Sequence, residues 1–243
     1  MNNDLIGAVI LLAYYLIAVA LMPVLLKYWF DIPTEYVRKI HHVGYSLSIF
    51  LLLHLFSTWY TAVGAALLLV VLGYPALMLI EKTPFYKRLF VERARSRGEL
   101  RKQLLYVQLS FGLLIFIFWG LLGTSWHFIA AVAVMAWGFG DAAAALVGKA
   151  FGRRKVIHRY IEKAKTIEGT AAMIGAACLA LFLTLYFYAG LSWLPSLIIA
   201  LIAAPFGGVL ELFSKKGLDT LTVPLGTSFI ILPLVYLFMF LGW

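Results

Sequence analysis

Long apolar runs, separated by short polar connections, account for nearly all of this 243-residue chain. A helix needs about 20 consecutive apolar residues to cross the hydrocarbon core of a bilayer. By that length the pattern predicts about eight transmembrane helices, over residues 4–26, 41–57, 59–80, 103–122, 126–148, 167–189, 193–213 and 222–242. The second of these is the shortest. We therefore expect an all-α polytopic membrane protein with a single transmembrane domain over residues 1–243.

The composition agrees with a membrane protein and excludes several soluble classes. The chain is 63% hydrophobic and 13% charged, with a mean hydropathy of +0.95, whereas average proteins carry about 25% charged residues. Its one cysteine, Cys178, can form neither an internal disulfide nor a thiolate metal site. Residues 1–15 lack a basic start and a small-residue cleavage pattern, so we expect a retained first helix and not a signal peptide.

The charged residues gather on one side of the predicted spans. All 20 Lys and Arg residues lie in the connections after the first, third, fifth and seventh spans, and of the 11 acids only Asp4 lies on the other side. The positive-inside rule makes the basic side cytoplasmic and puts both termini outside. Topology then explains the net charge of +9, and we expect no nucleic-acid partner. A short chain of this kind is typical of a prokaryotic plasma membrane.

One cytoplasmic connection has two interpretations. Residues 82–102 interleave basic side chains with Phe, Tyr, Leu and Val. This mixture is typical of a short helix that lies in the membrane interface over anionic lipids. The alternative is a solvated loop whose basic residues reflect only the positive-inside rule.

The candidate chemistry centres on residues 136–170. Asp141 lies about eight residues, or roughly 12 Å of helix, below the end of its span at Lys149. An ionisable side chain at that depth is costly and usually functional. A divalent cation would neutralise it, as would a structural salt bridge to another span. The adjacent Gly138 and Gly140 could let the backbone approach a ligand closely.

The basic loop after this span ends in Lys165, Thr166, Glu168 and Gly169, at the entrance to the sixth span. A helix amino terminus offers free N–H groups and a positive dipole end, which favour phosphate, and Lys165 adds a point charge there. Thr166 could equally be a simple helix cap, and Glu168 could simply compensate the helix dipole.

Two further polar clusters lie at predicted cytoplasmic ends. Arg38, Lys39 and His41 precede the second span, where they could hold phosphate oxygens and carry a proton, or could be topological charge alone. Glu211 lies in the last turn of the seventh span, where its charge opposes the helix dipole unless a cation is nearby. The following turn holds further polar residues, namely Lys215, Lys216, Asp219 and Thr220.

Four motifs follow one another between residues 38 and 225: RKIHH from Arg38, GDAAAALVGKAFG around Asp141, KTIEGT from Lys165, and ELFSKKGLDTLTVPL from Glu211. Together they resemble the CTP-dependent lipid kinases, the family of dolichol kinase, phytol kinase and the yeast-type diacylglycerol kinase. One departure is Thr220, where these kinases commonly have Asn. KTIEGT is also similar to the Lys-Thr-x-Glu-Gly run of phosphatidate cytidylyltransferases.

The resemblance implies transfer of the γ-phosphate of CTP to the hydroxyl of a polyprenol, a phytol-like alcohol or diacylglycerol at the cytoplasmic face, with Mg²⁺ as cofactor. It implies catalytic or metal-binding roles for Asp141, Glu211 and Asp219, and leaves open which carboxylate is the base. His41 is expected to carry a proton. The residues expected to bind the nucleotide or its phosphates are Arg38, Lys39, Gly138, Gly140, Lys149, Lys165, Thr166, Gly169 and Lys215.

Two other functions fit parts of the pattern. A cytidylyltransferase would join CMP to a lipid phosphate and release pyrophosphate, but the RKIHH motif and residues 219–224 favour the kinase. A small cation or metabolite transporter could also have eight spans with intramembrane acids. The ionisable residues, however, cluster on one side, so the predicted outer halves of the spans lack the polar residues that a transport path needs.

The predicted topology can be tested by glycosylation mapping. An acceptor sequence placed near Leu191 should be modified on expression in microsomes, because that connection is predicted to face outward. An acceptor near Arg154 should stay unmodified, since it lies in a basic loop. Gel mobility reports each outcome, and modification near Arg154 but not near Leu191 would reverse the predicted orientation.

Overall fold

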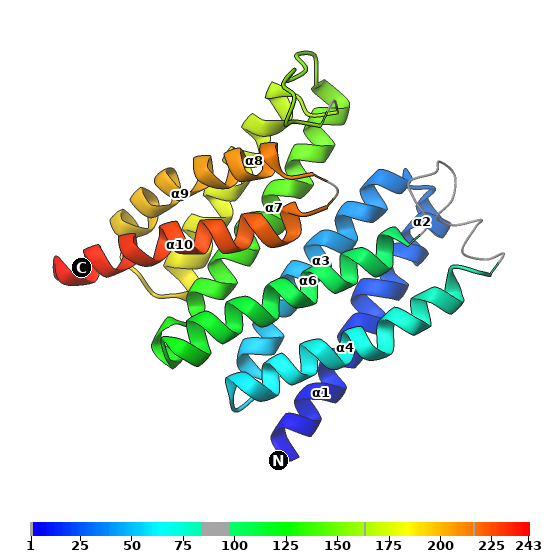
Figure 1. The fold of residues 1–243 in the computed structure, drawn as a ribbon, viewed down its shortest axis with the longest axis horizontal. Coiled ribbons are helices and arrows are strands. Elements are labelled where there is room, and N and C mark those ends of the chain that lie inside the picture. The colour runs from blue at the N-terminus through cyan, green and yellow to red at the C-terminus, as the bar shows by residue number, and fades with distance from the viewer. Residues whose placement is uncertain (1, 84–97, 163, 216) are drawn as a thin grey trace. The chain divides into compact units, whose positions relative to one another are not determined.

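The computed structural model describes residues 2–83, 98–162, 164–215 and 217–243, and these ranges are helical apart from short connections (Figure 1). Backbone packing separates the chain into two compact units, residues 1–120 and 121–243. That both units serve one catalytic domain stays a prediction.

In the amino-terminal unit, the first apolar run forms one continuous helical stretch. α1 (Asn2–Tyr14) passes through the π-helical segment η1 (Tyr15–Leu21) into α2 (Met22–Phe30). The other helices are α3 (Thr34–His54), α4 (Trp59–Ile80) and α6 (Glu99–Ile115), the last of which continues as the π-helical η2 (Phe116–Leu121).

Hydrogen bonds between helices stabilise the core of this unit. The Tyr15 hydroxyl lies 2.9 Å from Ser48 Oγ in α3 and accepts a hydrogen bond from the Gln108 amide in α6. The Tyr14 hydroxyl donates to the Gly44 carbonyl at 2.7 Å. Because no water is available in the hydrocarbon core, such bonds satisfy polar groups that would otherwise be costly. They therefore fix how the first helical stretch packs against α3 and α6.

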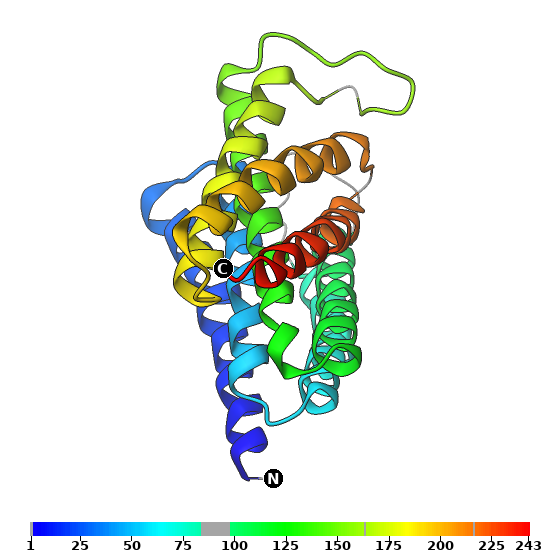
Figure 2. The ribbon, with the colours of Figure 1, turned by 90° about the vertical axis from the view of Figure 1, so that its left-hand side faces the viewer.

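The carboxyl-terminal unit is a group of four long helices. After the short η3 (Thr124–Trp126) come α7 (Phe128–Phe151), α8 (Ile167–Leu183) with its π-helical extension η4 (Thr184–Tyr188), α9 (Trp193–Phe213) and α10 (Asp219–Phe240). α7 packs against α8, α8 against α9, α9 against α10, and α10 returns to α7 (Figure 2). Residues 129–138 of α7 are all buried, so α7 forms the core of this unit.

Small residues let α7 and α8 approach each other closely. Gly140, Ala144 and Gly148 recur every four residues, so they lie along one face of α7. A Cβ added to Gly169 in α8 would lie 2.9 Å from the Ala144 carbonyl oxygen and 3.3 Å from the Gly148 Cα; one added to Gly140 would collide with the Met173 sulfur. Close backbone packing of this kind drives helix association inside a bilayer.

The predicted all-α polytopic membrane architecture is confirmed. Seven helical stretches in the described residues are long and apolar enough to cross a membrane: Asn3–Phe30, Trp59–Ile80, Leu100–Leu121, Thr124–Phe151, Ile167–Tyr188, Trp193–Phe213 and Asp219–Phe240. The remaining predicted span corresponds to α3, which has 21 residues. α3 begins at Thr34, before residue 41, so Glu35, Arg38 and Lys39 are part of the helix and not of the connection. These charges lower the hydropathy of α3.

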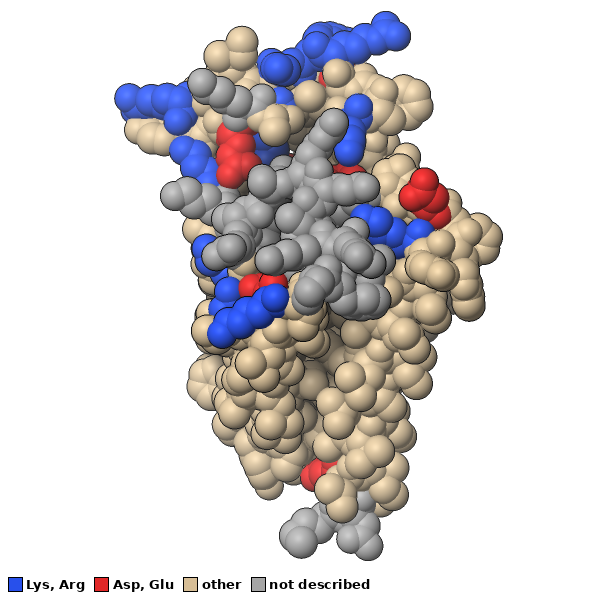
Figure 3. Space-filling model, turned by 90° about the vertical axis from the view of Figure 1, so that its right-hand side faces the viewer, with Lys and Arg blue, Asp and Glu red and all other residues tan. Residues whose placement is uncertain are grey.

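The outer faces of the spans are apolar. On α4, for example, Leu68, Val71 and Leu72 are 50%, 65% and 54% exposed, which is favourable in lipid but not in water. Figure 3 shows broad areas of the surface that carry no Lys, Arg, Asp or Glu. The interfacial helix predicted over residues 82–102 falls mostly on residues 84–97, outside the described residues. The side on which the termini lie stays a prediction.

The close α7–α8 contact predicts that Gly169→Ala destabilises the protein. The new methyl group would meet backbone atoms of α7, which cannot move aside. Overpacking typically costs about 1–3 kcal/mol, so the unfolding midpoint in detergent should fall by roughly 5 °C. Gly175→Ala is the matched control, because it lies in the same helix with no atom within 4 Å of the added Cβ. Equal midpoints for the two variants would contradict the contact.

Candidate active site

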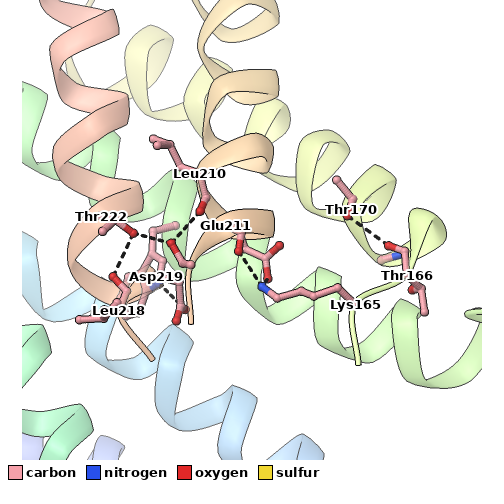
Figure 4. Close-up of polar contacts among 11 residues, drawn as sticks. Lys165, Thr166, Thr170, Leu210, Glu211, Leu218, Asp219 and Thr222 are labelled. Carbon is pink, nitrogen blue, oxygen red and sulfur yellow. Dashed lines mark hydrogen bonds and ion pairs between the residues drawn. The ribbon is translucent and has the colours of Figure 1, made fainter. Parts of the chain in front are cut away.

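A lysine and a glutamate from distant segments meet in the carboxyl-terminal unit. The Lys165 ammonium donates to the Glu211 carboxylate Oε1 and, at 2.6 Å, to the Glu211 backbone carbonyl (Figure 4). Glu211 lies in the last turn of α9, where carbonyls lack helical partners and the dipole end is negative. Lys165 therefore compensates both the carboxylate and the helix end, and it is the cation that the sequence pattern requires beside Glu211.

Backbone pairing fixes the position of Lys165 in the connection between α7 and α8. The N–H of Val156 donates to the carbonyl of Lys165 at 3.0 Å, and the N–H of Ile167 donates to the carbonyl of Arg154 at 2.9 Å. These two bonds lie on either side of an isolated antiparallel bridge. Lys165 is thus held directly before the first turn of α8, with its side chain extended toward α9 (Figure 4).

Two residues at the start of α8 hold the same connection in place. The Thr166 hydroxyl accepts from the Gly169 N–H at 3.1 Å, so Thr166 is the amino-terminal cap of α8. Glu168 Oε2 accepts from the backbone N–H groups of Arg153 and Arg154, both at 3.2 Å. Glu168 therefore anchors the loop as well as facing the helix dipole. The sequence does not reveal this anchor, because the pairing depends on how the loop folds back onto the start of α8.

The three carboxylates predicted to act together all lie in this unit. Asp141 in α7 and Glu211 in α9 are only 7% and 5% exposed. Asp141 and Asp219 both repel the Glu211 carboxylate electrostatically, whereas Lys165 attracts it. The structure thus brings the two aspartates and the lysine within electrostatic range of Glu211.

Trp137 also contacts this site, although it is not among the residues predicted from the sequence. Its side chain is completely buried, and its indole N–H donates to Asp219 Oδ2 at 3.4 Å. Trp137 precedes Asp141 by four residues, so both lie on the same face of α7. That spacing was the available signal in the sequence.

The turn between α9 and α10 positions Asp219 as the first residue of α10. Gly217 has φ +81°, a conformation that glycine adopts without strain. The Ser214 hydroxyl lies 2.6 Å from the Thr222 hydroxyl, which donates to the Leu218 carbonyl at 3.0 Å (Figure 4). These bonds tie the two helix ends together, and the dipole of α10 favours an acid at its first residue.

The other predicted nucleotide-binding residues of this unit have varied surroundings. Gly140 and Gly169 lie in the α7–α8 contact, and Gly138 is buried in α7. Lys149 is exposed in the last turn of α7, and Lys215 is half-buried in the turn after α9. Helix packing accounts for Gly140 and Gly169, and a role of the glycines in nucleotide binding stays a prediction.

The early basic cluster lies in α3 of the amino-terminal unit. Arg38 forms an ion pair with Glu35 one turn earlier. Lys39 and His41 are 4% and 5% exposed, and His41 Nδ1 lies 2.9 Å from the Val37 carbonyl oxygen. Because a carbonyl can only accept, Nδ1 is the donor, and Nε2 is the proton-accepting nitrogen of the neutral ring.

The carboxylates of this unit bear on whether a metal ion could enter together with a phosphate-bearing substrate. Among the residues that the structure describes, no group of three or more His, Cys, Asp and Glu side chains is arranged to hold a metal ion, and Glu211 is bound by Lys165. Mg²⁺ usually needs only one or two carboxylates, together with substrate phosphates and waters. Asp141 and Asp219 supply that number of carboxylates, and a Mg²⁺ site at these two residues stays a prediction.

Buried acids on membrane-spanning helices, with a lysine paired to one of them, indicate a functional site in a polytopic membrane protein. The chain is 34% identical to the phytol kinase of Synechocystis sp. (strain ATCC 27184 / PCC 6803 / Kazusa) over 228 residues, which cover 92% of this chain and 89% of the relative. It therefore belongs to the phytol kinase family of lipid-alcohol kinases. No family model and no solved structure matches the chain.

The Lys165–Glu211 pair predicts strong coupling in a double-mutant cycle. Lys165→Met or Glu211→Gln alone should each lower the free energy of unfolding by roughly 3 kcal/mol, because each breaks a largely buried ion pair. The double variant should cost clearly less than the sum of the two. Unfolding in mixed micelles measures the three values, with Lys149→Met as an exposed control. Additive costs would show that the two side chains do not interact.

Proposed function

We propose that this protein transfers the γ-phosphate of CTP to the hydroxyl of a lipid alcohol, with an isoprenoid alcohol such as phytol as the first candidate. The observation that carries the proposal is the Lys165–Glu211 ion pair, with Asp141 and Asp219 within electrostatic range of Glu211, in a chain that matches a phytol kinase over most of its length. CTP as the donor is supported by the four motifs alone. Other polyprenols, dolichol and diacylglycerol are further candidate acceptors.

Phosphoryl transfer requires that the charge of the triphosphate be neutralised and that the acceptor hydroxyl be aligned with it. Lys165 would turn from Glu211 to a phosphate oxygen when the nucleotide binds. Asp141 and Asp219 would hold a Mg²⁺ ion that enters with the nucleotide, and the ion would supply positive charge to the phosphates. Trp137 would keep Asp219 oriented through its indole N–H.

Glu211 is our candidate for the proton acceptor. Two carboxylates suffice for Mg²⁺, and release from Lys165 would leave Glu211 able to accept the proton of the lipid hydroxyl. His41, whose Nε2 can accept a proton, is the second candidate. Arg38 and Lys39 would contact phosphates. The positive-inside rule supports a reaction at the cytoplasmic face of a prokaryotic plasma membrane.

The deciding experiment uses purified protein in mixed micelles with Mg²⁺ and two differently labelled nucleotides. γ-Labelled and α-labelled CTP are offered in parallel to a panel of lipid alcohols and to phosphatidate, with γ-labelled ATP and UTP for comparison. Label entering a lipid alcohol from the γ position alone is the expected result and identifies the acceptor. Label entering from the α position would instead indicate a cytidylyltransferase, and no label from any nucleotide would favour transport.

Asp141→Asn should abolish phosphoryl transfer while the protein remains folded. The amide has nearly the same shape as the carboxylate but is a poor Mg²⁺ ligand, so we expect a loss of at least about 100-fold in kcat, or 2.7 kcal/mol. Asp4→Asn is the matched control, because Asp4 accepts hydrogen bonds from Ser57 in the amino-terminal unit. Turnover by Asp141→Asn at the wild-type rate would remove Asp141 from the site.

A further inference from the structure

The connection between α7 and α8 exposes a large apolar side chain to an unusual degree. Ile157 is 94% exposed, more than any other large apolar side chain among the described residues. Unlike the exposed side chains on the spans, it lies in a loop. Complete exposure of an isoleucine to water forfeits the favourable free energy of burial. An apolar partner at this point would recover that free energy.

Exposed cations surround Ile157 in sequence. We define the basic loop as residues 152–162, and its exposed cations are Arg153, Arg154, Lys155 and Arg159. Glu162 is the one acid of this loop. An apolar tip within a group of cations is typical of segments that bind the surface of an anionic bilayer. In such segments the burial of apolar area and the attraction to anionic lipids both strengthen binding.

Ring contacts hold the tip of the basic loop at the end of a membrane span. The His158 ring packs edge-on against Phe213, with 6.1 Å between ring centres and 85° between planes, and against Tyr160 at 5.5 Å. Phe213 is the last residue of α9, which is long and apolar enough to span a bilayer. The tip thus lies beside the end of a helix that is long and apolar enough to span a bilayer.

The side chains around Tyr160 suit the interface of a bilayer. The Arg159 guanidinium lies 4.4 Å from the centre of the Tyr160 ring, and Lys215 Nζ lies 5.8 Å from it. Tyr160 and Phe213 are 50% and 48% exposed. Tyrosine is enriched at membrane interfaces because its ring is apolar and its hydroxyl is wet, and arginine can extend its charge toward the headgroups.

We propose that the basic loop lies on the surface of the bilayer that the protein spans, with Ile157 inserted below the headgroups and Arg153, Lys155 and Arg159 bound to the phosphates of anionic lipids. A soluble phosphate compound would satisfy the cations but would leave Ile157 in water. The bilayer surface satisfies both. Because the same loop pairs with Lys165, contact with the membrane also steadies the position of that lysine.

The immersion depth of a spin label at position 157 tests this proposal. Ile157→Cys is made in a Cys178→Ala background, labelled, and placed in nanodiscs of zwitterionic lipid with or without phosphatidylglycerol. In the anionic nanodiscs, collisions with oxygen should exceed those with a water-soluble nickel complex, as they do for a label at Val71, which is 65% exposed on α4. This excess should shrink in purely zwitterionic nanodiscs and at high salt.

Charge variants test whether the cations of the basic loop, and not the overall positive charge of the protein, hold position 157 in the membrane. Arg153→Gln with Lys155→Gln should reduce the excess of oxygen collisions at position 157, whereas Lys82→Gln with Lys102→Gln, which removes two exposed charges elsewhere, should not. A label that is as accessible to nickel as a water-exposed site in every nanodisc would overturn the proposal. Withdrawal of the label on addition of inorganic phosphate at constant ionic strength would also overturn it, because the cations would then serve a soluble phosphate.

Discussion

The ion pair between Lys165 and Glu211 is the contact on which the rest of the candidate site depends. A carboxylate in the last turn of an apolar helix faces two penalties, loss of hydration and repulsion from the negative end of the helix dipole. Lys165 removes both, because it binds the carboxylate and the backbone carbonyl of the same residue. Asp141 and Asp219 repel the Glu211 carboxylate electrostatically, and the attraction of Lys165 opposes that repulsion.

That contact requires the α7–α8 connection to be rigid, and several weaker interactions make it so. The backbone bonds on either side of Lys165, the Thr166 cap and the Glu168 anchor all fix the segment that carries the lysine. The close approach of Gly148 and Gly169 brings the end of α7 beside the start of α8. Gly169 thus serves the site through helix packing, and its role in nucleotide binding stays a prediction.

The sequence predicted the spans well, because the length of an apolar run follows directly from the thickness of the bilayer. The predicted ranges 59–80 and 193–213 coincide with α4 and α9. Helix ends that carry charge were harder to predict, as α3 shows, because a charged turn can continue a helix beyond the apolar region. The dipole argument predicted that Glu211 needs a cation. It could not name Lys165, since the pairing depends on how two distant segments pack.

The energetics of buried ions bear on the presence of Glu211 in an apolar helix. Replacing a buried ion pair with apolar residues is often neutral or even stabilising, and α9 would cross the bilayer equally well with a leucine at position 211. Close packing and the polar bonds of the loop already hold α8 against α7 without this carboxylate. Glu211 therefore adds negative charge within electrostatic range of Asp141 and Asp219, although two apolar residues in place of both Lys165 and Glu211 could give similar stability. Such an arrangement is useful when a cation and a phosphorylated substrate must bind together.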